Sequence, residues 1–208
     1  MRHAPIVVAV LVAAFSIAPP AMAFNGNNAA TYADTYWNSR PNNYPAFSDD
    51  CTNFVSQSLH AGGIGFRTAT FSWTGAYATT TYWVANEVTI EYWTTSWSVV
   101  TANEQFLTSL PGSVMTVVTA TNMQNQPPSG YRQKGDVIYY DWDGNGTLDH
   151  ASILTVVNGT DPNNSAETGS LIDEHITDRY HAIWHLWPYN SDRITTDYFP
   201  LAISSSAS

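Results

Sequence analysis

A single cysteine is the residue whose type and position best suit covalent chemistry. Cys51 is the one cysteine among 208 residues, and it follows Asp49 and Asp50, either of which can cap the start of a helix. We therefore expect the thiol in a first helical turn, where unpaired backbone N–H groups and the helix dipole stabilise a thiolate. Position alone leaves two interpretations open, a buried structural cysteine and a catalytic nucleophile.

A thiol nucleophile needs a base, and His150 is the candidate. It lies directly after a turn, at the start of a strand predicted over 151–157. A histidine at a strand end can project its ring over a helix N-terminus, where a nucleophile would lie. Taken alone, His150 is more typical of a histidine packed against a turn.

Three sequence blocks resemble those of the papain-like cell-wall amidases, the cysteine peptidases of the NlpC and CHAP types. The blocks are DCTNFV at 50–55, KGDVIYY at 134–140 and DHASIL at 149–154. The group described as a "putative amidase domain" also shares the patterns seen here in YADTYWNSR and FSDDCTNFVSQ, which start at positions 32 and 47. The resemblance covers about residues 30–179 and implies that Cys51 is the nucleophile and His150 the base of a hydrolase.

The resembling family also orients its histidine with a polar residue on the next strand. That strand contains Asp173, Glu174 and His175; Asp173 and His175 share one face, and Glu174 takes the other. If the loop between the strands is centred near position 163, position 150 lies opposite about 176 or 177. We therefore predict His175 as the orienting residue, with Asp173 and Glu174 as the alternatives.

Helices come first along the chain and strands later. The pattern predicts helices at 28–37, between 48 and 62, and at 101–110, then strands at 136–140, 151–157 and 171–176. This order indicates an α+β fold. The resemblance implies a papain-like fold with N-terminal helices, a nucleophile at a helix N-terminus and a C-terminal antiparallel sheet. An insertion at about 66–130 carries no sharp motif and is expected to shape the substrate cleft.

The first 23 residues match a secretory signal peptide. A positive start at 1–3 precedes an apolar run of 15 residues at 4–18 and a small-x-small motif at 21–23. That run is shorter than the ~20 residues that span a bilayer. We expect a secreted, monomeric mature chain, residues 24–208, that forms a single domain without membrane insertion after cleavage.

The charge balance excludes a nucleic-acid partner. The chain has 7 basic and 17 acidic residues and a net charge of −10, whereas phosphate binding needs a concentrated basic face. The abundance of Trp, Tyr and Phe excludes disorder for most of the chain, because it supplies ample apolar surface for a core.

Two further patterns concern metals. Residues 141–149 match the first nine positions of a calcium loop, with a glycine at the sixth and oxygen ligands at alternate positions: Asp141, Asp143, Asn145, Thr147 and Asp149. The twelfth position, normally a bidentate glutamate, is Ser152, so an ordinary hairpin turn remains the alternative. His181 and His185 have the spacing of a helical zinc pair, but the tryptophans around them indicate packing instead.

We expect a cysteine-dependent amide hydrolase that needs no cofactor, with calcium as the candidate ion. Peptidoglycan or related peptides are the substrates that the resemblance implies. The alternative is a non-catalytic, aromatic-rich module that binds cell-wall carbohydrate and is stiffened by calcium. Its candidate stacking residues are Trp73, Trp83, Trp93 and Trp97.

Overall fold

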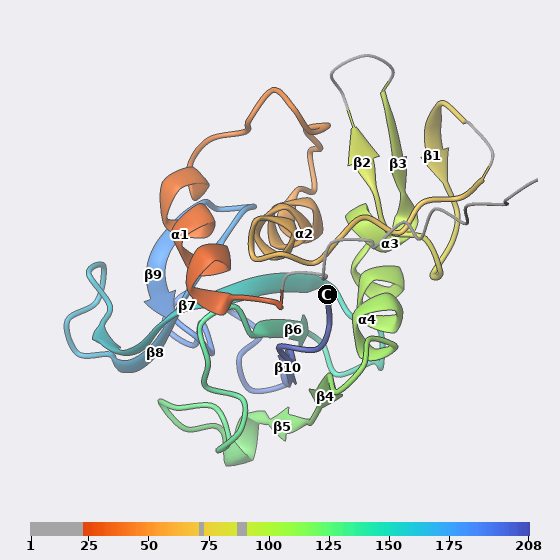
Figure 1. Ribbon diagram of the computed structural model, residues 1–208. Helices are drawn as coiled ribbons and strands as arrows, with labels where there is room; N and C mark the ends of the chain where they lie inside the picture. The colour runs from red at the N-terminus through yellow and green to blue at the C-terminus, as the bar shows by residue number, and fades with distance from the viewer. Residues whose placement is uncertain (1–22, 71–72, 87–90) are drawn as a thin grey trace, which may run out of the picture.

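The computed structural model describes residues 23–70, 73–86 and 91–208, so the predicted signal peptide lies outside the described residues except for its last position. Figure 1 shows helices on one side of a large sheet, with a smaller sheet beyond them. The elements are α1 (Gly26–Tyr36), α2 (Cys51–Ala61), β1 (Gly75–Tyr77), β2 (Ala85–Asn86), β3 (Tyr92–Thr94), α3 (Thr95–Ser98), α4 (Val100–Thr108), β4 (Val114–Met115), β5 (Val118–Thr119), η1 (Ala120–Asn122), β6 (Val137–Asp141), β7 (His150–Thr160), β8 (Thr168–Glu174), β9 (Arg179–Ile183) and β10 (Asp197–Ala202).

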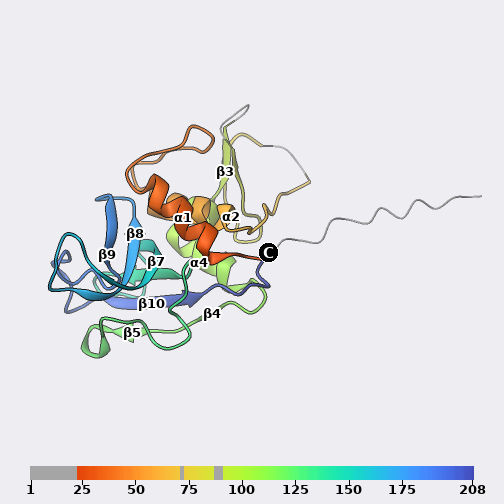
Figure 2. The ribbon, with the colours of Figure 1, turned by 60° about the vertical axis from the view of Figure 1, so that its left-hand side comes forward.

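The large sheet is formed by the C-terminal half of the chain. Its order is β4-β10-β6-β7-β8-β9, with β5 also paired to β10, and each pair is antiparallel. Two registers matter for the chemistry: Tyr140 lies opposite His150, and Ile153 lies opposite Asp173. Helices α1 and α2 lie across one face of this sheet in both ribbon views (Figures 1 and 2).

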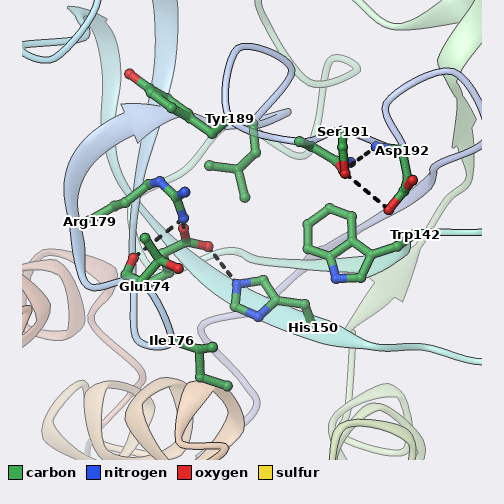
Figure 3. A pocket seen from close by; sticks show the side chains of 11 residues that line it. Trp142, His150, Glu174, Ile176, Arg179, Tyr189, Ser191 and Asp192 are labelled. Carbon is green, nitrogen blue, oxygen red and sulfur yellow. Dashed lines mark hydrogen bonds and ion pairs between the residues drawn. The ribbon is translucent and has the colours of Figure 1, made fainter.

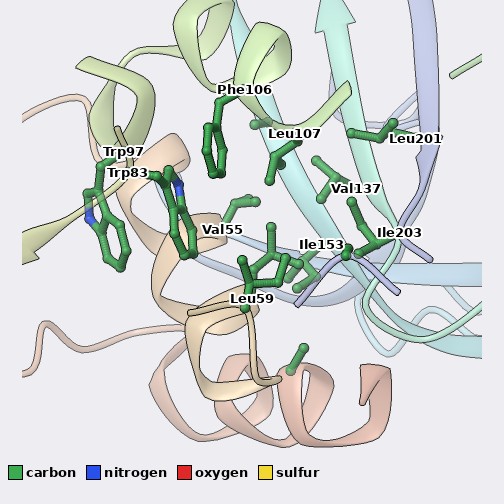
Figure 4. Close-up of a cluster of buried hydrophobic side chains, with 14 of the residues drawn as sticks. Val55, Leu59, Trp83, Trp97, Phe106, Leu107, Val137, Ile153, Leu201 and Ile203 are labelled. Carbon is green, nitrogen blue, oxygen red and sulfur yellow. The ribbon is translucent and has the colours of Figure 1, made fainter. Parts of the chain in front are cut away.

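The core lies between those helices and the sheet. Val137 and Ile153 pack with Val55 and Leu59 of α2 (Figure 4). Successive strand residues point to opposite faces, and the intervening positions form a second buried cluster on the other face: Val118, Ile138, Tyr140, Leu154, Leu171, Ile172, Ala182, Ile183, Trp184, Leu186 and Tyr198. Burial on both faces explains why these strands are nearly continuous apolar runs in the sequence.

The segment predicted as an insertion contributes to the core. Its small sheet has β3 between β1, to which it is parallel, and β2, to which it is antiparallel. Trp83 and Trp97 are fully buried with their ring centroids 4.6 Å apart, and Trp83 stacks on Phe106 of α4 (Figure 4). These two indoles therefore cannot stack on a carbohydrate at the surface, which removes half of the predicted stacking residues.

Two strands fall where the sequence pattern predicts no definite element. In β10, Pro200 lies opposite Ile138, although a proline inside a run usually argues against a strand. In β9, His181 has a φ of 53°, which interrupts the regular strand conformation. Among the described residues, no helix is both long and apolar enough to cross a membrane.

Candidate active site

Helix α2 brings the thiol to the sheet. It begins at Cys51, which is 3% exposed, and Asp50 is its N-cap residue. The Asp50 carboxylate makes no capping hydrogen bond to the first turn; it accepts instead from the Asn53 amide at 2.7 Å and from the Phe47 N–H at 3.2 Å. Since this aspartate does not cap them, the N–H groups at the start of α2 can stabilise an anion.

His150 lies close enough to Cys51 for each side chain to change the pKa of the other. The Cys51 Sγ also lies 3.6 Å from the Thr52 hydroxyl. Burial, the largest effect, raises the pKa of Cys51, but the effects of His150, Thr52 and the Ala151 N–H together bring the pKa below its usual value. Burial lowers the pKa of His150, but the charges of Glu174 and Cys51 raise it to about 10. The two shifts favour the thiolate and imidazolium forms of this pair.

Glu174 holds the other side of the imidazole ring. Its Oε2 lies 2.5 Å from His150 Nε2 (Figure 3). Arg179, at the start of β9, donates to the second carboxylate oxygen. Because Nε2 is engaged by Glu174, Nδ1 is the ring nitrogen left for Cys51. A thiol, an imidazole and a carboxylate in this order match the arrangement of nucleophile, base and orienting carboxylate in cysteine hydrolases.

The prediction that His175 orients His150 is corrected by this geometry. With Ile153 opposite Asp173, position 150 would lie opposite position 176, so the register agrees with the prediction. Side chains of an antiparallel pair share a face when they are directly opposite or two positions away. Glu174 therefore lies on the face of His150, and Asp173 and His175 lie on the other face. The choice of His175 rested on distance along the strand and did not establish which of the two faces His150 shares.

His175 faces the helices. Its Nδ1 lies 2.6 Å from Asp50 Oδ2 and its Nε2 lies 2.9 Å from the Tyr36 carbonyl oxygen. The ring stacks on Phe54 with centroids 4.0 Å apart, and Arg40 forms a second ion pair with Asp50 at 3.4 Å. His175 and Asp50 are both fully buried. This contact fixes the start of α2, and with it the thiol, against the sheet.

A pocket of about 250 Å³ opens beside His150 and Glu174. Figure 3 shows the indole of Trp142 at one side of the ring and Tyr189 across the pocket; Trp142 stacks on His150 at 5.5 Å. The remaining lining residues are Ile176, Thr177, Arg179, Leu186, Asn190, Ser191 and Asp192. The pocket gives a substrate group direct access to the imidazole side of the site.

Two residues of this site, Trp142 and Arg179, are not predicted by the sequence pattern. Trp142 lies in the calcium-like turn, between the predicted ligands at positions 141 and 143. The ligand pattern therefore gives it no role of its own. Arg179 opens β9, for which the sequence pattern predicts no definite strand. A basic residue close to the predicted Asp173–Glu174 segment was the available signal, since a buried carboxylate needs a partner.

The calcium-like turn gathers three carboxylates. Ligand atoms of Asp141, Asp143 and Asp149 lie within 4.8 Å of one another. Both oxygens of Asp141 and one of Asp149 accept backbone N–H bonds from within the turn, as an Asp-rich hairpin turn also does. At the twelfth position, Ser152 is buried and bonded to the Tyr140 hydroxyl at 2.7 Å, so it does not complete a ligand set. Calcium binding stays a prediction from the spacing.

We expect calcium to raise the melting temperature if the turn binds it. Extracellular sites have dissociation constants of roughly 10⁻⁴–10⁻³ M, and ten times that concentration adds about 1.4 kcal/mol to stability, or roughly 3–6 °C. Calorimetric scans at ~10 mM calcium and in chelator measure the shift. Asp143→Ala should remove it, and Asp192→Ala, outside the turn, should not. Identical scans in calcium and chelator would leave the turn as an ordinary hairpin.

The second metal pattern, His181 with His185, is not on a helix. His181 lies in β9, where its Nε2 is 2.8 Å from Asp34 Oδ1. His185 follows that strand, and its Nδ1 accepts the Trp187 N–H at 3.1 Å. The two rings therefore have different partners, as the packing interpretation predicts.

Comparison with known proteins defines the class to which this site belongs. The chain belongs to the family described as "Putative amidase domain", whose model matches residues 23–197. This range contains Cys51, His150 and Glu174. Family membership indicates an amidase-type hydrolase.

The chain is similar to the "Uncharacterized protein YhbB" of Bacillus subtilis (strain 168). The two are 32% identical over 126 residues, which make up 61% of this chain and 35% of that protein. The chain thus covers about a third of the length of this relative, at 35%. No solved structure matches the chain significantly.

Proposed function

We propose that the protein is a secreted cysteine-dependent amide hydrolase that acts on peptidoglycan or related peptides. The observation that carries the proposal is the buried Cys51–His150 pair with Glu174 behind it. We further propose that the fold is papain-like. One helix supplies the nucleophile at its N-terminus, and the antiparallel sheet beside it supplies the base and the orienting carboxylate.

The reaction follows from the positions of these groups. The Cys51 thiolate attacks the carbonyl carbon of the amide, and the imidazolium of His150 gives a proton to the leaving amine. Water, deprotonated by the now neutral His150, then hydrolyses the thioester and releases the acid. The uncapped N–H groups at the start of α2, that of Cys51 among them, stabilise the oxyanion. Glu174 stabilises the imidazolium and fixes the ring orientation. No cofactor is needed.

Substrate recognition rests on local contacts rather than on overall charge. With a net charge of −10, the protein gains no general attraction to an anionic cell wall. The pocket beside His150 offers the rings of Trp142 and Tyr189 and the polar residues 190–192. These groups suit a peptide or an amide-linked sugar, which is bound by stacking and hydrogen bonds.

Digestion of purified sacculi tests the substrate proposal. The mature chain should release soluble fragments, and mass spectrometry should find a new carboxyl end and a new amine at each cut. Intact sacculi after treatment with the folded enzyme would contradict the cell-wall substrate. Hydrolysis of a simple peptide amide in the same experiment would retain the thiol chemistry and change only the substrate class.

Two further measurements test the proposed state of the exported protein. Light scattering tests whether it is a monomer, and the mass of the exported chain tests cleavage before Phe24.

Alkylation of Cys51 tests the thiol chemistry separately. An ordinary thiol with a pKa of about 8.5 is only ~3% ionised at pH 7. Because His150 lowers the pKa of Cys51, the alkylation rate of the native protein should reach its plateau below pH 8.5. Removing the imidazolium leaves burial as the dominant effect on the thiol, so His150→Ala should move this transition to higher pH. Iodoacetamide rates measured from pH 4 to 10 give both curves.

A thiol that reacts only after unfolding would contradict the enzyme proposal and favour the carbohydrate-binding module. The control is His60→Ala. His60 also lies on α2, but its ring bonds the Ile64 carbonyl rather than the thiol. This variant should keep the wild-type alkylation profile.

A further inference from the structure

A second cluster of ionisable side chains lies on the other face of β8 from Glu174. It consists of Asp34 on α1, Asp173 on β8 and His181 on β9, each offering one ligand atom within 4.8 Å of the others. His181 Nε2 is 2.8 Å from Asp34 Oδ1. A tetrahedral metal with bonds near 2.0–2.2 Å holds neighbouring ligand atoms about 3.3–3.6 Å apart. Small side-chain rotations therefore suffice to bring all three atoms onto one ion.

One atom of this cluster is a buried polar atom without a hydrogen bond. Asp173 is fully buried, and its Oδ1 accepts from the His181 N–H at 2.8 Å and from the Thr155 hydroxyl at 3.3 Å. Its Oδ2 has no hydrogen-bond partner among the described residues. Buried carboxylate oxygens are normally satisfied, so this one is matched either by a bound cation or by a proton shared with the neighbouring Asp34 carboxylate.

Electrostatics favour a cation at the same position. Asp173 is fully buried, and one of its carboxylate oxygens lies within 4.8 Å of a carboxylate oxygen of Asp34. Two carboxylates this close repel each other when both are ionised, and a proton or a metal ion relieves the repulsion. When both carboxylates are ionised, a divalent cation bound between them removes this repulsion, which favours cation binding at the cluster.

We propose that Asp34, Asp173 and His181 bind a divalent transition-metal ion, and that zinc fits best. One imidazole and two carboxylates are a common zinc ligand set, whereas magnesium and calcium prefer oxygen ligands alone. The Asp34 and His181 side chains are 35% and 20% exposed, so the ion has a route from solvent and a water can take the fourth position. Bound there, the ion ties α1 to the β8–β9 hairpin that carries Glu174 and Arg179.

The test is metal binding to the Cys51→Ala protein, used as the full mature chain without a histidine tag. This background is needed because the Cys51–His150 pair would itself bind zinc through the thiolate. Calorimetric titration with zinc should give one ion per chain. Cobalt should give the visible absorption of a tetrahedral nitrogen and oxygen site, without a thiolate charge-transfer band. Zinc at a hundred times its dissociation constant should raise the melting temperature by roughly 5–10 °C.

Three variants locate the site. Asp34→Asn and His181→Gln each replace a partly exposed ligand with a residue of similar size, and each should weaken zinc binding by at least about tenfold. Asp143→Asn is the matched control, because it alters the other acidic cluster. It should leave the cobalt spectrum and the zinc affinity unchanged.

Two results would overturn the proposal. One is the absence of zinc and cobalt binding at ~1 mM, which would mean that a shared proton relieves the Asp34–Asp173 repulsion instead. The other is binding that persists in both Asp34→Asn and His181→Gln, or that is lost in Asp143→Asn. Neither result depends on hydrolytic activity, so this test is separate from that of the proposed enzyme.

Discussion

Cys51→Ala is expected to abolish amide hydrolysis while the protein stays folded. The change removes the nucleophile, and losses of about 10⁴–10⁶ in kcat accompany removal of a nucleophile that acts as a unit with its base. Alanine suits a helix, and only a sulfur atom is lost from a position that is 3% exposed. Initial rates of fragment release from sacculi measure the loss of activity, and circular dichroism with a melting curve for each protein measures the folding.

His150→Ala supplies the matched comparison. Because nucleophile and base act together, it should lose about as much activity as Cys51→Ala, and the double variant should lose no more than either. A folded Cys51→Ala protein that keeps more than a trace of hydrolysis would show that the thiol is not the nucleophile. Additive losses in the double variant would show that Cys51 and His150 act independently.

Glu174→Gln is expected to lower kcat by about 10²–10⁴, because removing the carboxylate behind a catalytic histidine destabilises the imidazolium and its orientation. Glutamine keeps the size of the side chain but not its charge. Glu174 raises the pKa of His150, so the pKa should fall in the variant. The imidazolium is then lost at lower pH, and the alkaline limb of the activity profile should move to lower pH. A profile of kcat from pH 5 to 10 measures the shift.

His175→Ala is the control for this prediction, since His175 lies next in the sequence but on the other face. It should spare the pH profile and lower stability by about 1–3 kcal/mol, because the buried Asp50 carboxylate loses its 2.6 Å partner. Urea unfolding curves measure this loss. If His175→Ala shifted the pH profile and Glu174→Gln did not, the assignment of Glu174 as the orienting residue would be wrong.

Local rules predict that Cys51 lies at a helix start and His150 at a strand start, whereas their proposed catalytic roles come from the family resemblance. Asp50 is the N-cap residue of the helix that begins at Cys51, although its side chain makes no capping hydrogen bond, and a turn rich in aspartate and glycine precedes the strand that begins at His150. Both rules act over a few residues and need no knowledge of tertiary structure. The strand register also follows from loop length, and Ile153 opposite Asp173 agrees with it.

The remaining contacts depend on elements that are far apart in the sequence. Choosing Glu174 over His175 requires the facing direction of each side chain as well as the register. Arg179 and the Asp34–His181 contact depend on β9, a short strand with a positive-φ residue. Trp83 and Trp97 are aromatic residues of the kind that bind carbohydrate, but both are buried in the core, where Trp83 stacks on Phe106 of α4. Patterns of polarity along the chain do not report such coverage, because it is created by tertiary packing.

The end of β8 has a consequence for how this protein can change in length. Asp173, Glu174 and His175 are consecutive, yet they face α1, His150 and the start of α2, respectively. A single-residue insertion or deletion in β8 would rotate all three side chains to the opposite faces at once. Insertions and deletions in the loop at 161–167, between β7 and β8, are tolerated only if each residue of β8 keeps its side chain on the same face of the sheet. A substitution at one of these three positions therefore affects one contact of the protein, whereas a register shift of one residue in β8 removes all three contacts together.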